Sequence, residues 1–288
     1  MQNLHYLFHK EYYADLDNPQ YKAFNNALTQ QRFEPGQREI FVTGLKSFVL
    51  KTQYPGLLLG LGYPHELGND AAEKKDCVQL GFSLDYVSGL PVIPGSTVKG
   101  VLRSLFKRAE GLKYILAELD KPELKSDQLI EDLFEGDDVY FDAWPITPAK
   151  DGKLLALESI TPHGNGLTEP NPIRLLKVRP EVAFLFRFRL TDKGQLSADE
   201  KLDLFKELLL LTGIGAKTNV GFGALEESMI PGPYKMLVMC ETAGASQPAA
   251  APPKAEGFCR ECGRPTKQNK AGRYYEFCFD CSQRVGRS

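Results

Sequence analysis

The sequence has no long apolar run and no excess of positive charge. No stretch approaches the roughly 20 apolar residues that a membrane-spanning helix needs. The first residues, MQNLHYLFHKEYY, lack the apolar region and cleavage site of a signal peptide. The formal net charge is −2, so the chain as a whole does not attract polyanions. We therefore expect a cytoplasmic protein with no membrane partner, in which any contact with a polyanion depends on locally clustered charge.

Two common phosphate-binding signatures are also missing, although the chain contains a glycine-rich loop, GIGAKTNVGFG, at residues 213–223. Leu211 and Ala216 replace the glycines that a Walker A loop needs before its lysine. Thr218 replaces the third glycine of a dinucleotide fingerprint, and an apolar helix precedes the loop where that fingerprint follows a strand. The loop nevertheless allows backbone N–H groups to approach an anion closely, with Lys217 as a point charge.

The stretch GLPVIPGSTVKGVLRSLF, at residues 89–106, predicts the start of a helix. Ser96 is the expected N-cap, with Thr97 as the alternative, and the helix is expected over residues 97–110. One stripe of this helix is apolar. A second stripe carries basic residues at every fourth position: Lys99, Arg103 and Lys107. The helix N-terminus is a natural seat for phosphate, and a solvated cationic stripe above a buried apolar one is the alternative interpretation.

Taken together, IPGSTVKGVLR and the later GIGAKTNVGFG loop resemble the RAMP superfamily of CRISPR–Cas proteins. GLPVIPGSTVKG after an alternating strand, ITPH at residues 160–163 and the overall length favour a RAMP subunit of the type III-B (Cmr) effector complex. The resemblance covers residues 39–240. It implies a ferredoxin-like or RRM-like βαββαβ core that holds guide RNA or guide–target RNA without cutting it, in a complex with other subunits.

The resemblance and the chemistry of the two motifs assign RNA contacts to the helix start and the glycine loop. Glycines allow close backbone approach, and basic side chains supply charge. A subunit that accepts any guide sequence suits phosphate and 2′-OH contacts better than base-edge contacts. The expected RNA-binding residues are Ser96, Lys99, Arg103, Gly213, Gly215, Lys217, Thr218, Asn219, Gly221 and Gly223.

Residue patterns alone also predict an α+β fold. The expected core elements are strand 39–52, helix 97–110, strand 139–143, strand 181–190, helix 198–212 and strand 220–227, which is βαββαβ with insertions. A helix is expected at residues 20–31, with further strands at 78–84 and 153–159. An RRM stacks bases on sheet aromatics, but Val220, Ala224 and Glu227 stand where those aromatics belong. We therefore expect no base stacking on the open sheet.

Three segments leave alternatives open. The N-terminal extension, residues 1–38, either packs on the core or meets a neighbouring subunit. The acidic segment 117–138 is typical of a solvated face and would also suit a basic partner. The Gly/Pro-broken stretch 54–69 either reaches RNA, with Tyr63 and His65 as stacking groups, or is a core-packed connection.

The sequence offers little for catalysis. Metal-free RNA cleavage needs a general base for the 2′-OH, usually with a second group for the leaving oxygen. His163 is the one tempting base, and neither Asp85 nor Asp142 has an evident partner. We therefore assign no catalytic residue. An endoribonuclease of the same superfamily and a protein–protein scaffold whose tail contacts nucleic acid are the alternative functions.

Most of the six cysteines lie in the C-terminal tail, residues 258–288, which follows an Ala/Pro-rich linker at 242–257 and a core at 39–241. Two CxxC pairs with fifteen residues between them have the spacing of a structural Zn²⁺ ribbon. The expected ligands are Cys259, Cys262, Cys278 and Cys281. Two redox pairs are the alternative, but the surrounding fold for that chemistry is missing. Cys77 and Cys240 lie in apolar contexts and are expected to be buried and inert.

The tail is expected to bind one zinc ion per chain. Cys278→Ser removes one of four thiolates, so it should lose the metal and unfold the tail while the core stays folded. Metal analysis of the purified protein and circular dichroism measure the two effects. Protein purified without chelators that contains no metal would contradict the assignment.

Overall fold

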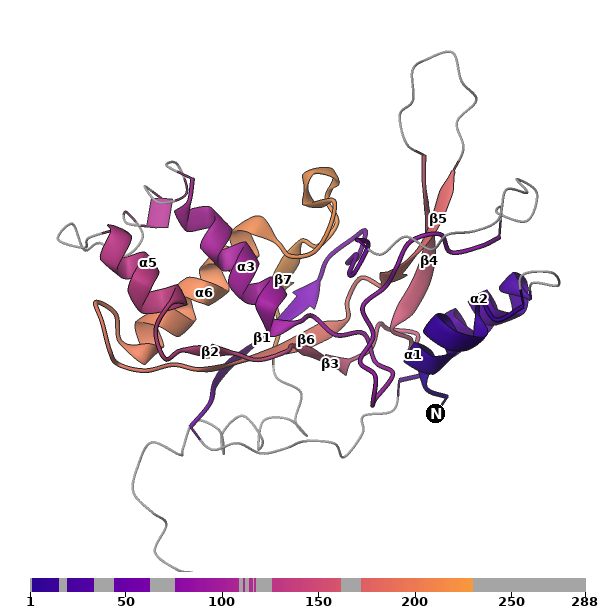
Figure 1. Ribbon diagram of the computed structural model, residues 1–288, viewed down its shortest axis with the longest axis horizontal. Coiled ribbons are helices and arrows are strands. Elements are labelled where there is room, and N and C mark those ends of the chain that lie inside the picture. Colours follow the sequence, from indigo (N-terminus) through magenta and orange to yellow (C-terminus); the bar gives the residue numbers. More distant parts are fainter. Residues whose placement is uncertain are drawn as a thin grey trace, which may run out of the picture. The chain divides into compact units, whose positions relative to one another are not determined.

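The computed structural model describes residues 2–15, 20–33, 44–62, 76–108, 111, 114–115, 117, 126–161 and 172–229 (Figure 1). The expected linker and cysteine-rich tail lie outside these residues, as do Cys240, His163, Tyr63 and His65. The described part mixes helices with antiparallel sheets. None of its helices combines the length and hydropathy that crossing a bilayer requires.

The central sheet is antiparallel and has the strand order β2-β6-β1-β7, with β3 also paired to β6. Its strands are β1 (Lys46–Thr52), β2 (Val139–Tyr140), β3 (Trp144–Thr147), β6 (Ala183–Arg189) and β7 (Leu225–Glu227). The long central pair sets the register, with Phe48 opposite Phe186 and Leu50 opposite Phe184. The expected strand 139–143 is interrupted after Tyr140, and the chain resumes pairing with β6 as β3.

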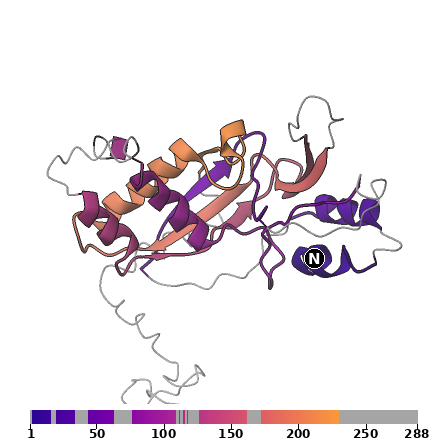
Figure 2. The same ribbon diagram turned by 45° about the horizontal axis from the view of Figure 1, so that its top comes forward.

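Two helices cover one face of this sheet, α3 (Gly95–Phe106) and α6 (Ala198–Thr212), and Figure 2 shows both on the same side. The alternation of β6 turns its even-numbered aromatics toward the helices, and the ring centroids of Phe188 and Phe205 lie 5.5 Å apart. The odd positions, including Arg187, share the opposite face. By register Trp144 lies opposite Leu185 on that face, so this side of the sheet does carry one aromatic residue.

Helix α6 has the predicted bounds, and its ends are set locally. Ser197 and Glu200 form a capping box, and the N–H of Gly213 donates to the Leu209 carbonyl at the other end. Within the helix, Lys201 is fully buried, and its ammonium donates to the Asp138 carboxylate (2.7 Å) and the Thr191 carbonyl (2.8 Å). This ion pair fastens α6 to the start of β2.

A two-stranded sheet and the N-terminal helices lie outside the central sheet and the two helices that cover it. The sheet pairs β4 (Leu155–Ile160) with β5 (Ile173–Val178), and Leu57 connects it to the core by backbone hydrogen bonds with Val178. The helices are α1 (Leu4–Tyr6), η1 (Leu7–Glu11) and α2 (Tyr21–Gln30). Leu4, Leu7 and Phe8 are buried in the main core. For these described residues, the extension packs on the core.

Several elements differ from the sequence expectation. Helix α3 begins at Gly95, two residues early, and its last helical residue is Phe106. Residues 78–84 make only isolated bridges, because Phe82 and Leu84 turn into the core without a continuous partner strand. Patterns also miss β5, and they miss α5 (Ser126–Phe134), which lies inside the acidic segment. Helix α5 forms because Leu129, Leu133 and Phe134 are buried against the core.

The buried ion pair provides a stability test. Lys201→Ala leaves the Asp138 carboxylate buried without its counter-charge, so we expect the free energy of unfolding to fall by on the order of 3–5 kcal/mol. Lys193→Ala is the matched control, because Lys193 pairs with the neighbouring Asp137 on the surface and should leave stability nearly unchanged. Urea unfolding of both variants measures the difference. Equal losses of unfolding free energy in the two variants would show that the buried pair contributes no more to stability than the surface pair.

Candidate nucleic-acid interface

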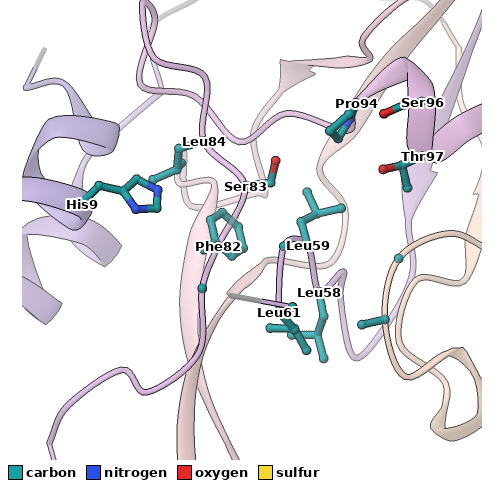
Figure 3. A pocket seen from close by; sticks show the side chains of 15 residues that line it. His9, Leu58, Leu59, Leu61, Phe82, Ser83, Leu84, Pro94, Ser96 and Thr97 are labelled. Carbon is teal, nitrogen blue, oxygen red and sulfur yellow. The ribbon is translucent and has the colours of Figure 1, made fainter. Parts of the chain in front are cut away.

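The helix start and the glycine loop meet at one cleft of about 780 Å³ (Figure 3). Pro94, Ser96 and Thr97 line it from α3, and Gly215 and Ala216 line it from the loop. The remaining lining comes from residues 58–62, residues 81–84 and His9. Figure 3 shows Ser96 and Thr97 on one side and His9 and Leu84 on the other, with leucines between them. Two motifs more than 100 residues apart in the sequence therefore share one surface.

Ser96 is not the N-cap of α3. The N-cap position is Pro94, and the first helical N–H, on Gly95, donates to the Asp142 carboxylate at 2.7 Å. Asp142 is therefore the capping residue, supplied from the loop after β2. A Cβ on Gly95 would overlap the Tyr140 carbonyl, which explains the glycine at this position. Ser96 is exposed at the cleft, and its hydroxyl makes no hydrogen bond within the described residues.

The basic stripe of α3 is partly engaged by the protein itself. The Arg103 guanidinium pairs with the Glu135 carboxylate just after α5. The Lys99 ammonium lies 5.7 Å from the centre of the Tyr140 ring, a cation–π distance. Burial raises the pKa of the Tyr140 phenol well above its ordinary value, so the ring stays neutral. Lys107 is exposed at the end of the helix. The opposite stripe of α3, including Val98 and Leu102, is buried as predicted.

The glycine loop uses its backbone N–H groups mainly inside the protein. Ile214 donates to the Gly223 carbonyl (3.0 Å), Ala216 donates to the Leu58 carbonyl (3.0 Å), and Gly223 donates to the Gly56 carbonyl (2.8 Å). These groups are therefore not available to an anion, contrary to the expectation from sequence. The partner of the loop is the segment 56–58, which follows β1. For residues 57–59 the structure favours a core-packed connection, because Leu57, Leu58 and Leu59 are buried, whereas Tyr54 is exposed.

The glycines permit this close packing. Gly215 has φ +93°, and a Cβ there would lie 2.5 Å from the Leu58 carbonyl oxygen. A Cβ on Gly223 would overlap the Ile214 carbonyl in the same way. A Cβ on Gly213 would lie 2.5 Å from the Gly223 carbonyl oxygen. Three of the four loop glycines thus pack too closely for a side chain, whereas a Cβ on Gly221 would meet only Pro55 Cδ, at the ordinary contact distance of 3.7 Å.

The tip of the loop, residues 217–221, is exposed and carries the residues that remain accessible. Lys217 adopts the left-handed conformation (φ +59°, ψ +36°), and a 3-10 turn, η3 (Thr218–Val220), follows it. Within the described part of the chain, the Lys217 ammonium has no ion-pair or hydrogen-bond partner. Thr218 and Asn219 are exposed beside it. The tip therefore offers an unneutralised cation and two polar side chains directly after the cleft residue Ala216.

The cleft is lined by apolar surface and hydroxyl groups. Leu58, Phe82 and Leu84 are buried beneath it, and Ser83, Ser96 and Thr97 are its hydroxyl side chains. No group of three or more metal-ligating side chains gathers anywhere among the described residues. Cys77 is buried, as expected, and burial raises the pKa of its thiol to about 11, which keeps it protonated and unreactive.

Residues 50–226 match the family model of the RAMP superfamily, which is more than half of the chain. The chain therefore belongs to the RAMP superfamily. Within it, the chain is Cmr6-like. It is 31% identical over 157 residues to the CRISPR system CMR subunit Cmr6 of Saccharolobus solfataricus, covering 52% of this chain and 49% of that protein. It is 28% identical over 201 residues to Cmr6 of Pyrococcus furiosus, covering 48% of this chain and 58% of that protein.

This chain thus spans about half the length of the curated relatives it matches. Two solved structures are also similar. The cryo-EM structure of the type III-B Cmr-β bound to cognate target RNA contains a chain that is 26% identical, with a TM-score of 0.47, 65% of this chain covered and 59% of that one. The crystal structure of Cmr6 from Pyrococcus furiosus is 25% identical, with a TM-score of 0.41, 66% of this chain covered and 100% of that one.

The packing role of the loop glycines is testable with a matched pair. Gly215→Ala and Gly221→Ala both place a side chain at a similar positive φ (+93° and +91°), but only the first meets a carbonyl oxygen. We expect Gly215→Ala to cost about 1–3 kcal/mol more in free energy of unfolding than Gly221→Ala. Urea unfolding measures the difference. Equal stability of the two variants would contradict the close-approach argument.

Proposed function

We propose that this chain is an RNA-binding subunit of a type III-B CRISPR effector complex in antiviral defence. One observation carries the proposal: the two RAMP motifs line a single cleft, and the cleft residue Ala216 is followed directly by Lys217, an exposed lysine with no partner among the described residues. Its partners are CRISPR guide RNA, possible target RNA paired to the guide, and other subunits of the complex. Membership of the RAMP superfamily and similarity to Cmr6 support this assignment.

We also infer that the core is the ferredoxin-like, RRM-like βαββαβ fold. Numbered along the chain, the core strands are β1, the interrupted β2 and β3, then β6, then β7. Their order in the sheet is second, third, first, fourth, and every pairing is antiparallel. Helices α3 and α6 connect the first strand to the second and the third to the fourth. This order and these connections support the assignment.

The RNA is held by its backbone in this proposal. Lys217 pairs with a phosphate at the tip, and Thr218 and Asn219 donate to phosphate or ribose oxygens. Ser96, exposed at the helix start, bonds a phosphate or a 2′-OH. Gly221 adds no side chain at the tip, and the closely packed glycines Gly213, Gly215 and Gly223 fix the backbone conformation of the loop. Lys99 and Arg103 continue the path along α3, with their charge reduced by their contacts in the protein.

The proposed role is non-catalytic. The alternative, an endoribonuclease, is favoured by one observation, which is that His9 lines the cleft. The ring of His9 packs against His5 (4.5 Å between centroids) and Phe8 (5.0 Å), a setting that suits a structural side chain. Metal-free cleavage also calls for a second group at the leaving oxygen, and the cleft lining contains no other titratable side chain.

The remaining domains are proposals from sequence. The N-terminal extension is residues 1–38 and the RAMP core residues 39–241, followed by the linker at 242–257 and the zinc ribbon at 258–288. The ribbon's Zn²⁺ is structural, since four thiolates close the coordination sphere. Cys77→Ser is the matched control for Cys278→Ser, because Cys77 is buried in the core and should leave the zinc content unchanged.

The proposal predicts how Lys217→Ala affects RNA binding. Binding of the full chain to labelled guide RNA should weaken to a similar extent for unrelated sequences. The slope of log K against log salt should fall by about 0.7 for one lost phosphate contact on a single strand. Fluorescence anisotropy at several salt concentrations measures both. Lys150→Ala is the control, because Lys150 is an exposed lysine already paired with Glu181.

The same samples separate the alternatives. If Lys217→Ala binds like the wild type and deletion of the tail abolishes binding, the core is a scaffold and the ribbon contacts the nucleic acid. If the wild type cuts the RNA and either His9→Ala or His163→Ala stops the cleavage, the chain is an endoribonuclease. We expect no cleavage with or without magnesium.

A further inference from the structure

A short turn at Gln53–Gly56 lies beside the tip of the glycine loop. The N–H of Gln53 donates to the Ala224 carbonyl (2.9 Å), and the N–H of Gly223 donates to the Gly56 carbonyl (2.8 Å). The position that a Cβ on Gly221 would take is 3.7 Å from Pro55 Cδ. The turn and the tip are thus two neighbouring pieces of backbone, held together by hydrogen bonds at their bases.

Each piece exposes a large apolar side chain. Tyr54 is 83% exposed on the turn, and Val220 is 68% exposed on the tip. The adjoining residues Leu57 and Phe222 are buried, so apolar side chains in these two segments do reach the core, whereas Tyr54 and Val220 do not. Two exposed apolar side chains on adjoining, well-anchored backbone are typical of a binding surface.

The same tip carries the free cation. The Val220 N–H donates to the Lys217 carbonyl at 3.1 Å, so both residues belong to one tight turn. An aromatic ring, an aliphatic side chain and an ammonium group therefore project from one small region. A nucleotide presents the complementary chemistry, with an apolar base face and an anionic phosphate. A protein partner would also suit the apolar pair, but the exposed lysine in the same turn as Val220 favours a nucleotide.

We propose that Tyr54, with Val220 beside it, forms a stacking surface for one unpaired base of the RNA strand. This inference rests on the proposed RNA-binding function and extends it. A strand that follows the cleft passes Ala216 and reaches the tip next, where Lys217 takes the phosphate and Tyr54 takes the base. Stacking tolerates every base, because each has a π-face. It therefore adds affinity without restricting the guide sequence, and it does so on a loop rather than on the open sheet.

The test compares three variants of the full chain on fluorescein-labelled single-stranded RNA. Tyr54→Ala should weaken binding by about 5- to 150-fold, the usual range for one lost stacking contact. Tyr54→Phe keeps the ring and should bind like the wild type. Because the side chain is uncharged, Tyr54→Ala should leave the salt slope unchanged, whereas Lys217→Ala lowers it. Tyr86→Ala is the matched control, since Tyr86 is 76% exposed on a turn and its backbone carbonyl accepts a hydrogen bond from Asn3. This variant should not change affinity.

A second measurement identifies the contact directly. RNA with 5-iodouridine should photocrosslink to Tyr54 in the wild type, as mapped by mass spectrometry, and the crosslink at this site should be absent from Tyr54→Ala. On an oligonucleotide with abasic residues, Tyr54→Ala and the wild type should bind equally.

The possible failures are distinguishable. If the wild type binds RNA and Lys217→Ala weakens it while Tyr54→Ala does not, the stacking surface is overturned and the proposed function stands. If Tyr86→Ala weakens binding as much as Tyr54→Ala, the specific site is likewise overturned. If Tyr54→Ala impairs only assembly with other subunits, the tip is a protein contact. If the wild type binds no RNA, the proposed function and this inference both fail.

Discussion

The close packing of the glycine loop against residues 56–58 is the constraint on which the candidate site depends. Hydrogen bonds from Ala216 to Leu58 and from Gly223 to Gly56 join two backbones that pass at a distance only glycine allows. This contact closes one side of the cleft and fixes where the loop tip projects. A side chain at Gly215 would push the two backbones apart, and the cleft and the tip would change together.

Two carboxylates that flank the short strand β2 hold the two helices that lead to the cleft and to the glycine loop. Asp138, just before the strand, holds α6 through the buried ammonium of Lys201, and Asp142, just after it, caps α3 through the N–H of Gly95. An edge strand of two residues thus anchors both helices that cover the sheet. Since α3 begins at the cleft and α6 leads into the glycine loop, both binding motifs are positioned from this one strand.

The groups that this loop leaves accessible differ from those of a phosphate-binding glycine loop. There, glycines expose backbone N–H groups to the anion. Here the N–H groups of Ala216 and Gly223 donate to backbone carbonyls of the protein. The accessible polar groups are instead side chains at the tip, and Lys217 is the cation among them. The base of the loop is hydrogen-bonded and closely packed, and the tip presents charge and apolar surface. That combination suits the RNA-binding role that we propose for this Cmr6-like RAMP protein.

The sequence by itself determined the superfamily and the bounds of α6, because each depends on local signals. Ser197, Glu200 and Gly213 mark the ends of α6 within a few residues of it. Only the tertiary structure decided that the two motifs line one cleft, that Asp142 caps α3 and that Gly215 lies against Leu58. It also decided that α5 and β5 form, and that residues 78–84 do not pair as a strand. These outcomes depend on contacts between residues far apart in the chain, and a local pattern of residue types does not specify its distant partner.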